Sequence, residues 1–148
     1  MALLVEIRVD VFGEDGIPHT FLKVTNPDGS IDYFGFAPQQ SGAPFGPGEV
    51  FFEDHEYQFS SGEISLTQQQ YINLMDGIAE SIINPPTYDL SSSFGKQCAT
   101  WALSQLVDAE IIPPYLGPQG IPLADSLIFN PFWEGFGFGI CKKTNFLD

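Results

Sequence analysis

Cys98 is a cysteine placed where nucleophilic chemistry is favoured. Apolar residues recur at helical spacing from Gly95 or Lys96 to Ala109, which predicts a helix with Cys98 in its first turn. The amides and the dipole at a helix start favour a thiolate and can stabilise a developing oxyanion. Taken alone, however, this position is more typical of a buried, inert cysteine packed against a sheet.

His19 is the candidate partner of Cys98. It follows a Gly-Ile-Pro turn and begins a predicted strand over residues 18–25. From there its ring could reach the start of a helix packed on the sheet and act as a general base. By itself it also fits an ordinary histidine at a strand end, so the interpretation depends on the pair.

The elements that must position this pair are predicted from periodicity and turn residues. Alternation predicts a strand over residues 3–12, and the Asn-Pro-Asp-Gly turn at 26–29 joins strands 18–25 and 30–36 in a hairpin. Residues 37–48 are expected to form a loop, and residues 50–59 to contain a further strand. Thr67 and Gln70 fit a capping box that starts a helix ending at Pro85-Pro86, and residues 122–129 could add a short helix.

The composition predicts one α+β domain over residues 1–148, an antiparallel sheet packed against two main helices. Hydrophobic residues make up 43% of the chain, enough for a core, and fifteen Gly with twelve Pro indicate long, turn-rich connections.

The order and setting of the two residues resemble a known family. His19 opens the run His-Thr-Phe-Leu-Lys-Val-Thr, a turn leads to Tyr-Phe-Gly-Phe-Ala-Pro at 33–38, and a Pro/Gly loop and a helix precede Cys98. This looks like the circularly permuted papain-like cysteine hydrolases, which include Nlp-type amidases and relatives of lecithin:retinol acyltransferase. It is most similar to toxin domains of bacterial secreted effectors. The resemblance covers roughly residues 19–111 and implies Cys98 as nucleophile and His19 as base.

The sequence departs from this family at two points. Many relatives have Asn before the nucleophile, whereas this chain has Gln97. The residue that orients the histidine is not obvious: the hairpin places Ser30, Asp32 or Tyr33 opposite His19. Asp32 is the best chemical candidate, because a carboxylate fixes the tautomer and stabilises an imidazolium. Strand alternation removes Asp32 from consideration if it faces away from His19.

The charge excludes some classes of partner. The formal net charge is −14, and Lys142-Lys143 is the only basic pair, so nucleic-acid binding is not expected. The apolar stretch at 127–140 is too interrupted for a membrane span, and no signal peptide is visible at the start. We therefore expect export by another route or as part of a longer chain, with delivery into a target cell compartment.

The remaining candidates favour structural interpretations. The acidic run Glu53-Asp54-His55-Glu56 could hold Ca²⁺, but its spacing matches no known loop motif, so a solvated acidic face is expected. Two Cys and two His give no zinc spacing, and we expect no metal and no cofactor. A Cys98–Cys141 disulfide is the main rival, because it would remove the nucleophile. Trp101 is expected in the core.

Three functions remain open at this point. The first is an amidase or peptidase, with peptidoglycan peptide as the leading substrate and, by family habit, an inhibitor (immunity) protein as partner. The second uses the same residues on a lipid ester or in acyl transfer. The third is a non-catalytic binding module with an inert Cys98.

Overall fold

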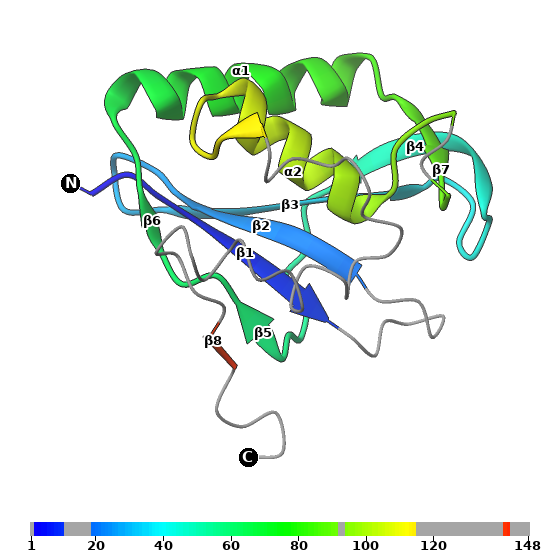
Figure 1. The fold of residues 1–148 in the computed structure, drawn as a ribbon, viewed down its shortest axis with the longest axis horizontal. Coiled ribbons are helices and arrows are strands. Elements are labelled where there is room, and N and C mark those ends of the chain that lie inside the picture. The colour runs from blue at the N-terminus through cyan, green and yellow to red at the C-terminus, as the bar shows by residue number, and fades with distance from the viewer. Residues whose placement is uncertain (1, 11–18, 92–93, 115–140, 143–148) are drawn as a thin grey trace.

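The chain forms an antiparallel sheet with two helices on one face (Figure 1). The computed structural model describes residues 2–10, 19–91, 94–114 and 141–142. Within these residues the strand order is β7-β4-β3-β2-β1-β5-β8, and β6 also pairs with β1. The elements are β1 (Leu4–Asp10), β2 (His19–Thr25), β3 (Ile31–Pro38), β4 (Phe45–Phe51), β5 (Phe59–Ser60), β6 (Ile64–Ser65), α1 (Gln68–Ile83), β7 (Thr87–Asp89), α2 (Cys98–Asp108) and β8 (Cys141–Lys142). The α+β class predicted from the sequence is confirmed.

Side-chain alternation gives the sheet two different faces. The helix-facing side of β1 and β2 carries the apolar residues of the main core, among them Val5, Ile7, Val9, Leu22 and Val24. The register pairs the intervening residues of these strands on the opposite face, including Glu6 with Lys23 and Arg8 with Phe21. The central strands are thus buried on the helix side by apolar packing and on the other side by mixed polar and aromatic contacts.

Both helices begin at side-chain caps. The hydroxyl of Thr67 accepts a hydrogen bond from the Gln70 amide at 3.1 Å, and the Thr67 amide donates to Gln70 Oε1 at 2.9 Å, which confirms the predicted capping box. Trp101 of α2 is buried in the core, as expected, and its indole N–H donates to Ser81 Oγ of α1 at 3.0 Å. This bond ties the two helices together above the sheet.

The largest difference from the predicted strands is β4. The sequence indicated a loop up to residue 48, yet Phe45–Phe51 pairs with β3 on one side and β7 on the other. Gly48 explains the exception, because a Cβ there would lie 2.2 Å from Phe36 Cζ and 2.5 Å from the Pro86 carbonyl oxygen. The glycine is needed for close packing inside a strand, not for a turn.

Some predicted features fall outside the described residues: the short helix at 122–129 and the apolar stretch at 127–140. In the part of the chain that the structure describes, neither helix is long and apolar enough to cross a membrane.

Candidate functional site

Cys98 is the first residue of α2, and Gln97 caps the helix. Gln97 Oε1 accepts a hydrogen bond from the Ala99 amide at 3.0 Å, and the Gln97 amide donates to Thr100 Oγ1 at 2.8 Å. The Gln97 side chain also accepts from the Thr100 amide in a capping box. Sequence reasoning treated the helix-start amides as a ready oxyanion site; the structure shows two of them already engaged by Gln97.

The loop before Cys98 is organised by the buried carboxylate of Asp89. Its Oδ1 accepts from the Ser91 amide and hydroxyl, and its Oδ2 accepts from the Phe94 amide at 2.8 Å. Gly95 then passes close to β7, where a Cβ would lie 2.3 Å from the Thr87 carbonyl oxygen. These contacts fix the direction in which the chain enters α2.

Cys98 carries a thiol, not a disulfide, and its sulfur contacts β2 and the cap of α2. The Thr20 amide donates to Sγ at 3.4 Å, and Sγ lies 3.7 Å from Gln97 Oε1, to which the thiol donates. Cys98 is 5% exposed. The rival Cys98–Cys141 disulfide is therefore not formed in this structure.

Burial controls the protonation of this thiol. It raises the pKa of Cys98 to about 11, while the amides of Thr20, Ala99 and Cys98 itself act in the opposite direction. Tyr88 of β7 is the titratable neighbour: burial, and then the charge that Cys98 would carry, raise the Tyr88 pKa to about 12. In the resting arrangement both groups are neutral at physiological pH.

The His19 ring lies on the sheet face opposite α2. It stacks on Phe21 with ring centroids 6.0 Å apart and meets the His55 ring edge-on at 4.9 Å. Its Nε2 is 3.0 Å from where a Gly35 Cβ would be, so the glycine makes room for the ring. Phe21 pairs in register with Gly35, which places all three residues on the same face.

The Cys98 sulfur is thus close to the backbone of His19, not to its imidazole ring. Thr20, whose amide holds the sulfur, directly follows His19 in β2. Because one peptide link spans about 2.4 Å from the Thr20 nitrogen to the His19 Cα, the sulfur lies within about 6 Å of that Cα. The structure brings the sulfur to the His19 backbone, while the imidazole packs against the other side of β2.

His19 is neutral in this position. Burial and the nearby His55 lower the His19 pKa to about 4, and the charge of Asp10 acts in the opposite direction. Asp10 pairs directly with His19 across β1 and β2. Opposed residues of antiparallel strands carry side chains on the same face, so Asp10 is the carboxylate placed to act on the imidazole.

Asp32 does not have this relationship to His19. It pairs with Val24, whose side chain is in the helix-side core, so Asp32 projects from the face opposite His19. Its Oδ2 accepts from Asn26 Nδ2 at 2.7 Å, and Asn26 Oδ1 accepts from Tyr71 OH at 2.6 Å. Asp32 therefore joins the hairpin turn to α1 and does not orient His19, which corrects the sequence-based interpretation.

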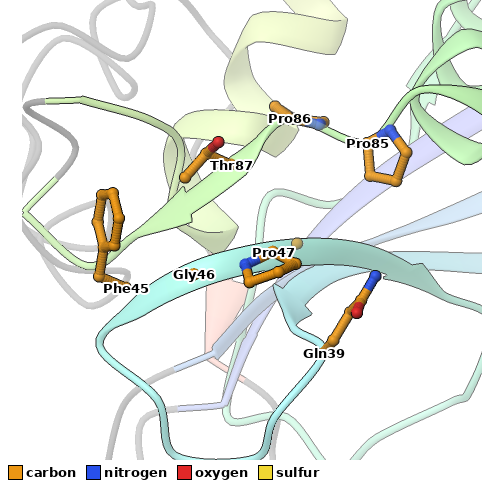
Figure 2. Close-up of a pocket in the computed structure, with 8 residues that line it drawn as sticks. Gln39, Phe45, Gly46, Pro47, Pro85, Pro86 and Thr87 are labelled. Atoms are coloured by element: carbon orange, nitrogen blue, oxygen red, sulfur yellow. The ribbon is translucent and has the colours of Figure 1, made fainter.

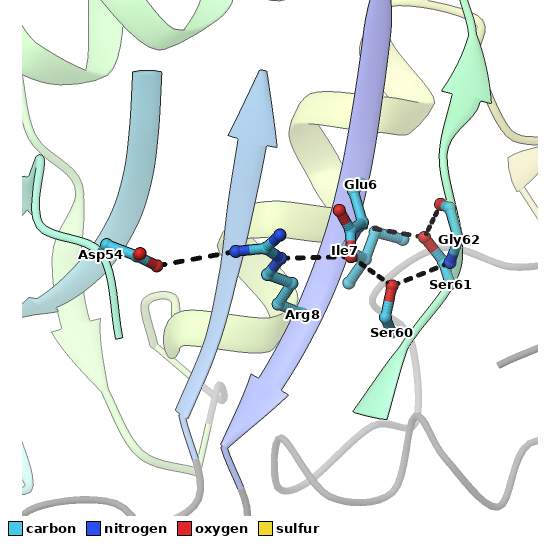
Figure 3. Close-up of polar contacts among 7 residues, drawn as sticks. All are labelled: Glu6, Ile7, Arg8, Asp54, Ser60, Ser61 and Gly62. Carbon is cyan, nitrogen blue, oxygen red and sulfur yellow. Dashed lines mark hydrogen bonds and ion pairs between the residues drawn. The ribbon is translucent and has the colours of Figure 1, made fainter. Parts of the chain in front are cut away.

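The acidic segment around His55 covers the second face of the sheet. His55 packs against His19 and Phe21, and the Asp54 carboxylate lies 3.6 Å from Arg8, which also lies 3.1 Å from Glu6 (Figure 3). Glu53, Asp54 and Glu56 are exposed, which confirms the solvated acidic face expected from the sequence. The described residues contain no cluster of three or more His, Cys, Asp or Glu that could hold a metal ion.

An apolar groove of about 520 Å³ lies along the β4–β7 edge (Figure 2). Phe45, Pro47, Pro85, Pro86 and Thr87 contribute to its lining. Phe45 pairs with Asp89 of β7 and is 58% exposed. Phe94, in the loop between β7 and α2, is 85% exposed. Two aromatic side chains are thus open to solvent, Phe45 in β4 and Phe94 in the loop that leads to Cys98.

Sequence reasoning missed Asp10, Thr20 and Tyr88. Asp10 could have been found, because the alternating strands 3–12 and 18–25 are sequential and one antiparallel register pairs it with His19. Thr20 and Tyr88 have no sequence signal, since only the packing of α2 on the sheet brings them to Cys98.

Comparisons of the chain with protein-family models, with curated proteins and with solved structures find no match.

Proposed function

We propose that this protein is a cysteine-nucleophile hydrolase in which Cys98 attacks a carbonyl and His19 transfers the proton. The observation that supports it best is the hydrogen bond from the Thr20 amide to Cys98 Sγ, because it places a helix-start thiol beside the backbone of His19. The resemblance to permuted papain-like hydrolases, a strand histidine followed by a helix-start cysteine, supports the same assignment.

The proposed reaction starts from a neutral pair. The His19 ring leaves its stacking position on Phe21 and approaches the sulfur through a change of backbone conformation where β2 begins, because a χ1 rotation alone would keep the ring on its own face of the sheet. Its neutral imidazole accepts the thiol proton as Sγ bonds to the substrate carbonyl carbon, and returns that proton to the leaving amine. Water then hydrolyses the thioester by the same route and restores the free thiol.

Asp10 takes the role that the sequence assigned to Asp32. Asp10 pairs with His19 across β1 and β2, so its charge stays close to an imidazolium formed at His19 and stabilises it. The direction in which Asp10 changes the His19 pKa agrees with this role.

An amide in a peptidoglycan peptide is our leading substrate, with the chain acting as a secreted bacterial effector restrained in its producer by an inhibitor protein. Purified peptidoglycan incubated with the full chain should yield new termini, detected by mass spectrometry. Cys98→Ala and His19→Ala should each abolish these products, while Cys141→Ala, which alters the other cysteine, should retain them. Full activity in either of the first two variants would refute the proposal.

A lipid ester is the second candidate substrate, favoured by the exposed Phe45 and Phe94 beside the loop that leads to Cys98. Aromatic side chains open to solvent suit contact with an acyl chain. Phospholipid vesicles replace peptidoglycan in the same experiment, and free fatty acid lost in Cys98→Ala would favour this candidate. Absence of products from both substrates would leave the non-catalytic binding module as the better interpretation.

A further inference from the structure

The hydroxyl of Thr20 is a polar group buried without a partner. Thr20 is 0% exposed, and its Oγ1 has no hydrogen-bond partner among the described residues. Buried hydroxyls are usually hydrogen-bonded, because leaving one unsatisfied loses its interaction with water. Valine has the same shape as threonine and would fill this position in the strand without leaving a polar group unsatisfied. The presence of a hydroxyl here therefore needs a physical reason.

The position of Thr20 supplies one. It pairs with Val9 on the helix-facing side of the sheet, so its side chain projects toward α2. Its own amide already donates to Cys98 Sγ at 3.4 Å. The unpartnered hydroxyl therefore belongs to the residue that holds the sulfur at the start of α2.

We propose that the Thr20 hydroxyl is a hydrogen-bond donor reserved for the Cys98 sulfur in its anionic state. This inference rests on the proposed function, since it concerns the same nucleophile. The neutral thiol donates its proton to Gln97 Oε1 and accepts from the Thr20 amide. Once the proton leaves, the sulfur accepts further hydrogen bonds, and the Thr20 hydroxyl can turn toward it without breaking an existing bond.

The charged groups around the sulfur do not provide this stabilisation. Tyr88 of β7 stays protonated through the relevant pH range, because its pKa is about 12, so it carries no charge that acts on the sulfur. His19 lies on the other side of β2, and its pKa of about 4 leaves it neutral. The Thr20 amide already holds the sulfur, and the hydroxyl of the same residue is a buried donor that has no partner among the described residues.

The test compares Thr20→Val, which keeps the shape and removes the hydroxyl, with Thr20→Ser, which keeps the hydroxyl. Thr25→Val, at the far end of β2, controls for valine in this strand. The rate of iodoacetamide alkylation of Cys98 is followed against pH in a Cys141→Ala background, together with the midpoint of thermal unfolding. The alkylation measurement requires no substrate, so it remains informative even if the hydrolase proposal fails.

Thr20→Val should shift the alkylation profile to higher pH and lower the rate about tenfold below the midpoint, which corresponds to about one pKa unit. Thr20→Ser and Thr25→Val should leave the profile in place. Thr20→Val should unfold at the same or a higher temperature, because it removes an unsatisfied buried group. Alkylation profiles that coincide for Thr20→Val and the parent would overturn the inference, whatever the change in unfolding temperature.

Discussion

The amide of Thr20 donates to Cys98 Sγ across 78 positions of sequence. This contact ties the first residue of α2 to the second residue of β2, and so fixes the sulfur next to His19 in the chain. It also divides the candidate pair, because the Thr20 side chain faces α2 whereas the His19 ring faces Phe21 and His55. The resting structure thus has the nucleophile in place and the base turned to the other side of the strand.

The first prediction concerns the reactivity of Cys98. Because burial raises its pKa from 9.0 to about 11, the native thiol should react slowly with iodoacetamide at neutral pH. The rate should increase with pH as the thiolate forms, with a midpoint at about 11 rather than 9.0. Mass spectrometry of the Cys141→Ala variant measures it at a single site.

The denatured protein is the control for this prediction. In denaturant the midpoint should return to 9.0, the value of an unburied thiol. A native midpoint well below that value would mean that His19 already forms an ion pair with Cys98 in the resting protein, contrary to the ring position described above.

The second prediction separates Asp10 from Asp32. If Asp10 stabilises the His19 imidazolium, Asp10→Asn should lower kcat/KM by about a hundredfold or more, with little change in unfolding. Asp32→Asn should leave kcat/KM nearly unchanged. It should lower the free energy of unfolding by about 1 kcal/mol, because the carboxylate accepts from Asn26. Loss of activity in Asp32→Asn alone would restore Asp32 as the orienting residue.

The local architecture was predictable from the sequence because it depends on neighbouring residues. Strand alternation around Val5 and Val9, the turn after Asn26 and the capping box at Thr67 each depend on contacts within or between adjacent elements. The same reasoning placed Cys98 in the first turn of its helix, and the structure puts it at the first position.

The site could not be predicted in full because it depends on which face each strand presents. A hairpin turn indicates that residues 30–33 lie opposite β2, but only the register shows that Asp32 shares a face with Val24 and not with His19. The position of His55 depends on a connection between β4 and β5 that has no periodicity. Sequence reasoning thus identified the reactive residue types, and the tertiary register determined their relationships.

The third prediction is an acid-dependent loss of stability that originates at His19. Its pKa is lowered from 6.5 to about 4, so the folded state binds this proton less well than the unfolded state. The stability that the protein gains from keeping His19 neutral is fully present above pH 6.5 and is lost as pH falls toward about 4. The total loss in the free energy of unfolding is about 3 kcal/mol.

Denaturant unfolding of the parent and His19→Gln over this pH range checks the third prediction. The substituted side chain does not titrate, so the slope of stability against pH should decrease in the variant. His55→Gln removes the second of the two histidines and should reduce the slope only in part, because burial is the larger cause of the low His19 pKa. Equal slopes in the parent and His19→Gln would contradict the assignment.

The fourth prediction tests the loop that delivers Cys98 to its position. In Gly95→Ala the added Cβ would lie 2.3 Å from the Thr87 carbonyl oxygen, a backbone atom that cannot rotate away. The loop must therefore move, at a cost of about 2 kcal/mol in the free energy of unfolding. The same movement should displace the start of α2 and weaken the Thr20–Cys98 contact, so the alkylation profile of Cys98 should change as well. Phe94→Ala alters the preceding residue, whose side chain is 85% exposed, and should change neither quantity. Normal stability and an unchanged profile in Gly95→Ala would show that the close approach of Gly95 to β7 does not position the cysteine.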